Sequence, residues 1–160
     1  MGLNYFGILI FTLLLIPRLI LIFAPPIRRV HHQAHHQLSI LETIGDAGCS
    51  FFGLITIFDI GYKPINFTCE VIWIVLVTLL FIIHYGFYIR YLIKGRKEEL
   101  LYDRLLIYSP IYVSKVLIYL ISGILLFNPF IIVFSIMYGI ATLIINYKKN
   151  FEWGIYYVYV

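Results

Sequence analysis

The stretch EVIWIVLVTLLFIIHYGFYIRYLI, at residues 70–93, is almost wholly apolar and constrains the fold more than any other feature of this chain. A membrane-spanning helix needs about 20 mostly apolar residues. Other apolar runs lie on both sides of it, and Asn128-Pro129 marks a tight turn between the last two. We therefore predict an all-α, polytopic integral membrane protein. Its five transmembrane helices are expected at about residues 3–23, 43–60, 70–93, 106–127 and 130–147.

The composition supports the same fold class. Hydrophobic residues make up 62% of the 160 residues and charged residues only 12%, whereas soluble domains average roughly 45–50% and about 25%. A soluble core of this size could not bury so much apolar surface. We expect one transmembrane helical domain over residues 1–160, with the lipid bilayer as its solvent and no nucleic-acid partner.

Lysine and arginine are distributed unevenly among the predicted loops. With five spans, the 24–42 loop, the 94–105 loop and the C-terminal segment share one side, and the opposite side holds only Lys63. The shared side holds Arg28, Arg29, Arg90, Lys94, Arg96, Lys97, Arg104, Lys148 and Lys149. Cytoplasmic loops carry such an excess, so the N-terminus is expected outside and the C-terminus inside a multi-pass protein of the cell (plasma) membrane. Residues 148–160 are rich in Trp and Tyr, which predicts an interfacial aromatic tail.

The second predicted span, within LETIGDAGCSFFG, carries two stripes of four-residue spacing. Gly45, Cys49 and Gly53 form a small-residue stripe, which lets another helix approach closely. Glu42, Asp46 and Ser50 form an adjacent polar stripe. The first stripe predicts helix packing. The second fits either a structural ion pair or a binding site.

Several ionisable residues fall toward the cytoplasmic third of the predicted bundle. A charge at the centre of a membrane helix costs on the order of 3 kcal/mol, so such groups usually face the protein interior or a wet cavity. Asp46 is too short to reach the headgroups, and Arg18 or Lys115 is its expected partner. The candidate ligand-binding residues are Arg18, Glu42, Asp46, His84, Arg90 and Lys115.

Four of the five histidines lie in HHQAHHQ, at residues 31–37. His31, His32, His35 and His36 are candidate ligands for a divalent metal, because i, i+4 histidines share a helix face. The spacing H-x-x-H-H at residues 32–36 resembles a box of the fatty acid desaturase and hydroxylase superfamily. Such enzymes need several boxes, and His84 alone cannot form another. A juxtamembrane collar and a pH sensor are the other interpretations of this cluster.

Three classes of function remain open. The chain could bind or transport a small solute, ion or lipid headgroup through a cytoplasmic-side polar cavity. It could be a membrane subunit or scaffold of a larger complex. It could also be a metal-dependent enzyme using the His31–His36 cluster, although the sequence favours a role that is not enzymatic. Because five spans are few for a complete transporter, we expect a homo-oligomer or a partner membrane subunit.

Overall fold

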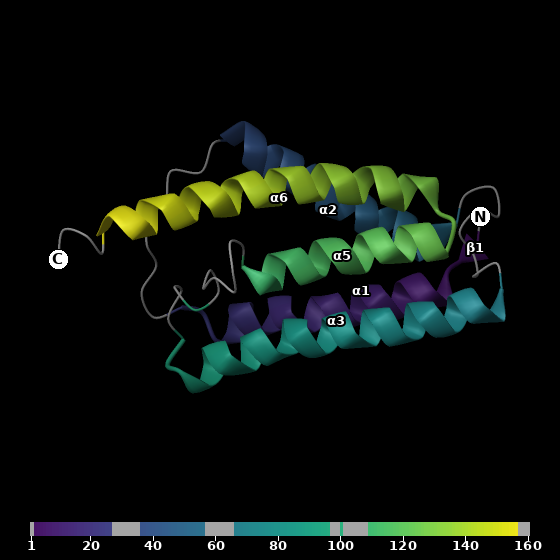
Figure 1. Cartoon of the computed structure of the whole chain (residues 1–160), viewed down its shortest axis with the longest axis horizontal. Helices are drawn as coiled ribbons and strands as arrows, with labels where there is room; N and C mark the ends of the chain where they lie inside the picture. Colours follow the sequence, from purple (N-terminus) through teal and green to yellow (C-terminus); the bar gives the residue numbers. More distant parts are fainter. Residues whose placement is uncertain (1, 27–35, 57–65, 97–99, 101–108, 157–160) are drawn as a thin grey trace.

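The described residues of the computed structural model, which are 2–26, 36–56, 66–96, 100 and 109–156, form five helices and one short strand pairing. The helices run roughly along one long axis (Figure 1). Their bounds are Tyr5–Phe23 for α1, His36–Leu54 for α2, Phe67–Ile93 for α3, Pro110–Leu125 for α5 and Pro129–Tyr156 for α6. Strand β1, Gly2–Leu3, pairs antiparallel with β2, Ile55–Thr56.

The helix bounds differ from the expected spans mainly at α2 and α6. Helix α2 begins at His36, inside the predicted 24–42 loop, because residues 36–42, a mixture of polar and apolar side chains, belong to the same helix as the apolar run. Helix α6 continues to Tyr156, through most of the predicted tail 148–160, since no proline interrupts its backbone hydrogen bonds. The four residues 157–160 lie outside the described part of the chain.

Side-chain amides fix two of the helix starts. Asn4 is fully buried and caps α1, since its Oδ1 accepts hydrogen bonds from the backbone N–H groups of Phe6 at 3.0 Å and Gly7 at 3.3 Å. Asn128 immediately precedes α6, and its side-chain Oδ1 accepts a hydrogen bond from the Ile131 backbone N–H at 3.2 Å. It also donates to the Phe52 carbonyl at 3.1 Å. The turn at Asn128-Pro129 therefore joins α5 and α6 as the predicted hairpin and ties them to α2.

Helices α2 and α6 pack along one side of the bundle, α1 and α3 lie along the other, and α5 lies between the two pairs (Figure 1). Trp73 of α3 joins three of these helices. Its indole Nε1 donates to Ser122 Oγ of α5 at 3.0 Å, and its ring meets Phe6 of α1 edge-on with centroids 5.1 Å apart. Buried aromatic and aliphatic side chains continue this core along α5 and α6.

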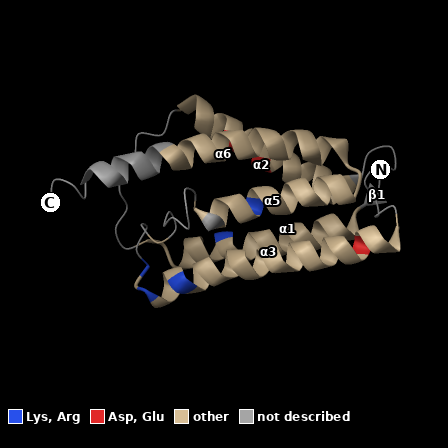
Figure 2. Ribbon diagram, in the orientation of Figure 1, with Lys and Arg blue, Asp and Glu red and all other residues tan. Residues whose placement is uncertain are grey.

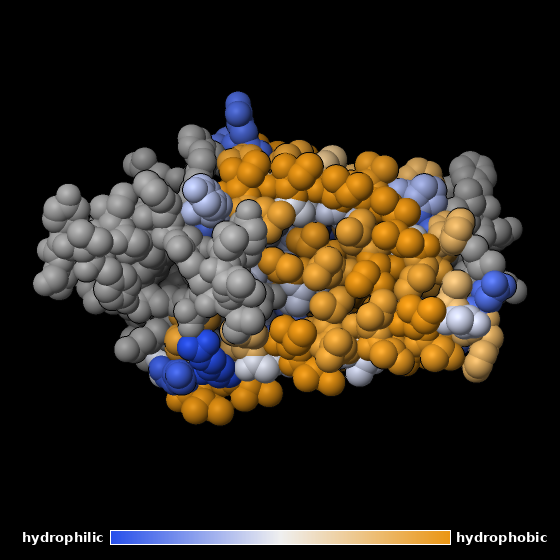
Figure 3. Space-filling model, viewed as in Figure 1, coloured by the Kyte–Doolittle hydropathy of each residue, from blue (hydrophilic) through white to orange (hydrophobic). Residues whose placement is uncertain are grey.

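Helices α1, α3 and the Pro129–Tyr147 part of α6 are long and apolar enough to cross a membrane, and α5 adds a shorter apolar helix. Apolar side chains form a belt over the visible face, with hydrophilic residues toward its ends (Figure 3). Charges lie at both ends of α3, with Glu70 in its first turn and Arg90 in its last (Figure 2). These features indicate a membrane protein. The number of spans and the orientation stay predictions.

Candidate functional site

A cavity of about 650 Å³ lies between the helices, and all five contribute to its wall. This volume lies within the range of small-molecule binding sites, which is roughly 300–1,000 Å³. The charged and polar lining residues include Arg18, Glu42, Asp46, Ser50, His84 and Lys115. Tyr88, Tyr112 and Tyr138 add aromatic rings with hydroxyl groups. The rest of the wall is apolar, with Phe11 and Leu14 among its residues, and the cavity is partly open. A cavity with a charged centre therefore lies between helices whose outer surfaces are largely apolar.

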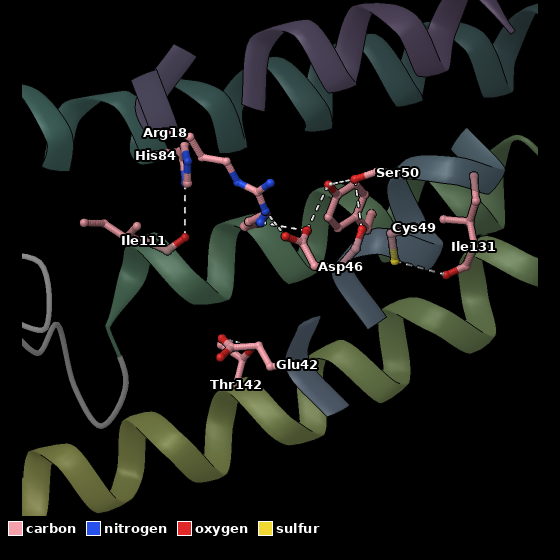
Figure 4. A network of polar contacts seen from close by, with 11 residues as sticks. Arg18, Glu42, Asp46, Cys49, Ser50, His84, Ile111, Ile131 and Thr142 are labelled. Atoms are coloured by element: carbon pink, nitrogen blue, oxygen red, sulfur yellow. Dashed lines mark hydrogen bonds and ion pairs between the residues drawn. The ribbon is translucent and has the colours of Figure 1, made fainter. Parts of the chain in front are cut away.

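Asp46 of α2 is the central residue of the cavity. Its carboxylate forms an ion pair with the Arg18 guanidinium of α1 (Figure 4). The Lys115 ammonium of α5 lies 2.8 Å from Asp46 Oδ1, and the Tyr119 hydroxyl donates to the same oxygen at 3.3 Å. The Ser50 hydroxyl, one turn further along α2, lies 3.3 Å from the Tyr119 hydroxyl. One carboxylate thus connects three helices.

The two ion pairs of Asp46 differ in burial. The Lys115 and Asp46 side chains are only 13% and 14% exposed, whereas the Arg18 side chain is 53% exposed. A buried pair repays its desolvation cost only with good geometry, and removing one partner leaves an uncompensated charge. The Tyr138 ring, whose centroid is 5.0 Å from the Lys115 ammonium, adds a cation–π contact. Lys115 and Asp46 therefore depend on each other more than Arg18 depends on either.

Glu42 lies one turn before Asp46 on α2 and faces α6. Its Oε1 accepts a hydrogen bond from the Thr142 hydroxyl at 3.0 Å (Figure 4). Thr142 belongs to a buried polar stripe on α6 formed by Ser135, Tyr138, Thr142 and Asn146. Sequence reasoning missed this stripe. Its spacing of three and four residues within an apolar helix was the signal that could have revealed it.

His84 of α3 is held at the cavity wall by α5. Its Nδ1 lies 3.1 Å from the Ile111 carbonyl oxygen and 2.9 Å from Ser114 Oγ. The Ser114 hydroxyl itself donates to the Ile111 carbonyl at 2.9 Å. Since a carbonyl oxygen only accepts, the contact with Ile111 requires that His84 donates from Nδ1.

The structure brings five of the six predicted ligand-binding residues to one cavity. They are Arg18, Glu42, Asp46, His84 and Lys115. The sixth, Arg90, lies in the last turn of α3 and does not line the cavity. Both partners expected for Asp46 are present, because Arg18 and Lys115 each pair with it. The binding role of these residues stays a prediction.

The small-residue stripe of α2 packs inside the chain. A Cβ on Gly45 would lie 2.7 Å from the Tyr138 backbone nitrogen of α6. Cys49 is 1% exposed, and its Sγ lies 3.9 Å from the Ile131 carbonyl oxygen. Gly53 contributes differently, because its backbone carbonyl lies against Gly7 of α1 while its own Cβ position is open. The stripe therefore contacts α6 and α1.

The candidate metal site falls mostly outside the described residues, which exclude His31, His32 and His35. His36 is the first residue of α2 and is exposed. Within the described ranges, no three His, Cys, Asp or Glu side chains come close enough to hold a metal ion. The metal-binding role of the histidine cluster stays a prediction.

Comparisons with protein-family models, with curated proteins and with solved structures find no match for this chain. A functional assignment must therefore come from the cavity itself.

Proposed function

We propose that the chain is a small integral membrane protein that binds or transports a small solute, ion or lipid headgroup through the cavity around Asp46, which opens on the cytoplasmic side of the membrane. The observation that carries this proposal is the cavity of about 650 Å³, with Arg18, Asp46 and Lys115 joined inside it. All five described helices contribute residues to its wall.

The energetic cost of the charged residues supports a functional role. Arg18 and Lys115 lie inside helices that are otherwise strongly apolar. Placing such groups within a membrane is costly, and they commonly mark the paths of substrates and ions. An ion pair that served stability alone would need no space of this size beside it. A cavity bordered by charges instead provides room and polar partners for a ligand.

The packing of α2 argues against the scaffold interpretation. That interpretation needs Gly45 and Cys49 to face a partner chain. In the structure α6 of the same chain covers both residues. The small-residue stripe therefore serves the internal packing that positions Asp46. Assembly into a homo-oligomer through another face stays a prediction.

Reaction of an engineered thiol with a charged reagent tests the proposal. Ser50→Cys places a thiol at the cavity wall. The substitution is made in a protein that already carries Cys69→Ser. The buried Cys49 is kept, and this protein without Ser50→Cys gives the background reaction. Leu79→Cys is the matched control, because Leu79 is 53% exposed on α3 in a segment apolar enough to cross a membrane. Both variants are treated in vesicles with a membrane-impermeant, cationic methanethiosulfonate reagent, applied to each side in turn.

We expect Ser50→Cys to react from the cytoplasmic side on the order of 100-fold faster than Leu79→Cys, because a charge in the apolar region costs about 3 kcal/mol. Equal, slow reaction of the two thiols would show that no polar solute reaches the cavity. Fast reaction from the opposite side alone would contradict the proposal that the cavity opens toward the cytoplasm.

A further inference from the structure

The charged residues that line the cavity balance one another. Arg18 and Lys115 contribute two positive charges, and Glu42 and Asp46 contribute two negative charges. A ligand of one sign would leave a net charge in surroundings of low dielectric constant, where an uncompensated charge is expensive. A ligand with no net charge keeps the balance. The cavity therefore favours a molecule whose own charges cancel.

The charges do not balance at each point of the cavity, because the two carboxylates lie at different positions along α2 while both cations pair with Asp46. Two cations and one carboxylate meet at Asp46, so this end of the cavity has a positive surplus. Glu42 lies four residues earlier on α2, and its carboxylate accepts from the uncharged Thr142 hydroxyl. In Figure 4 Arg18 lies above the Asp46 carboxylate and Glu42 lies below it. The helical rise separates Glu42 from Asp46 by about 6 Å.

The donors at the positive end exceed what Asp46 can accept. A guanidinium carries five N–H donors and an ammonium three, and both groups share this carboxylate with the Tyr119 hydroxyl. An anionic group on a ligand can take the remaining donors. At the other end Glu42 can pair with an ammonium group, and the tyrosine rings of the wall can add cation–π contacts.

From these observations, and resting on the function proposed above, we infer that the ligand is a small zwitterion. Its anionic group binds at Arg18 and Lys115, and its ammonium group binds at Glu42. A free amino acid-like solute and an ethanolamine phospholipid headgroup share this chemistry. The two charges of the ligand are expected to lie no further apart than about one helical turn, as Asp46 and Glu42 do.

Protection of the Ser50→Cys thiol against N-ethylmaleimide tests the inference. In the first arm the probes are 4-aminobutyrate, butyrate and butylamine, which share one carbon chain and differ in charge. In the second arm the protein is reconstituted in nanodiscs of phosphatidylglycerol alone or of phosphatidylglycerol with phosphatidylethanolamine. We expect 4-aminobutyrate to protect at about tenfold lower concentration than either single-charge probe, or phosphatidylethanolamine to protect where phosphatidylglycerol does not. The arm that responds identifies the source of the ligand.

Glu42→Gln supplies a readout that a purely structural role would not change. It removes the negative charge that would pair with the ligand's ammonium group. The variant should therefore be protected better by the anionic probe than by the zwitterionic one. That anionic probe is butyrate in the first arm and phosphatidylglycerol in the second. Equal protection by zwitterionic and single-charge probes, or an unchanged preference in Glu42→Gln, would overturn the inference. So would the absence of protection by every probe. If no probe protects but Ser50→Cys still reacts rapidly with the charged reagent, the accessible cavity is retained and only the inference of a zwitterionic ligand is rejected.

Discussion

The buried ion pair between Asp46 and Lys115 predicts a loss of stability when either residue is neutralised alone, with the larger loss at Asp46. The two side chains are 14% and 13% exposed, and their charged atoms are 2.8 Å apart. Removing one partner of a buried pair costs about 3–5 kcal/mol, because the other charge stays buried without compensation. We therefore expect Asp46→Asn to lower the free energy of unfolding by this amount, because it leaves the Lys115 ammonium without its carboxylate. Lys115→Met should cost less, because the Arg18 guanidinium still pairs with Asp46.

The double variant Asp46→Asn/Lys115→Met should lose less than the sum of the two single losses, because it leaves neither buried charge behind. Residues in direct contact show coupling energies of about 0.5–3 kcal/mol. Arg18 loses its partner in this variant as well. Its side chain is 53% exposed, so its contribution is expected to be closer to the 0–1 kcal/mol of exposed pairs.

The assay is reversible unfolding of the protein in mixed micelles, followed by circular dichroism as sodium dodecyl sulfate is added. Glu70→Gln is the control, since Glu70 is a carboxylate in the first turn of α3, at the other end of the bundle from Arg90. Its loss should cost only about 0.3–1 kcal/mol through the helix dipole. Strict additivity in the double variant, or single losses no larger than that of Glu70→Gln, would refute the reasoning.

Packing substitutions give two more predictions. Gly45→Ala should destabilise the protein by about 1–3 kcal/mol in the same unfolding assay, because its Cβ would meet the Tyr138 backbone. Gly86→Ala is the control, because the space around its Cβ is open, and it should be neutral or stabilise the protein by up to about 1 kcal/mol. Equal effects of Gly45→Ala and Gly86→Ala would contradict the close packing of α2 on α6. Trp73→Phe should cost about 1 kcal/mol, since it removes the hydrogen bond to Ser122, and no loss would show that this bond is not formed.

The apolar runs predicted most of the helical architecture. Residues 3–23, 70–93 and 130–147 each contain much of a helix, and Asn128-Pro129 marks the observed hairpin. The ends were harder to predict, because hydropathy reports the apolar run and a helix continues for as long as its backbone hydrogen bonds do. Helix α2 thus begins at His36, and α6 reaches Tyr156.

The charged centre of the cavity was predictable, while much of its wall was not. Asp46 is a short acid within an apolar run, and so it required a cationic partner. That reasoning pointed to Arg18 and Lys115, and both pair with it. The roles of Tyr119 and Tyr138 depend on how α5 and α6 are rotated against α2, and a single hydropathy pattern does not fix this rotation. The volume beside Asp46 depends on the same geometry.

A density map of the protein in lipid nanodiscs is the most direct test of the proposed binding cavity. We expect an open space beside the ion pair of Arg18 and Asp46, containing non-protein density that contacts Arg18 or Lys115. A bundle whose helices close over Asp46 and leave no space beside it would contradict the proposed function.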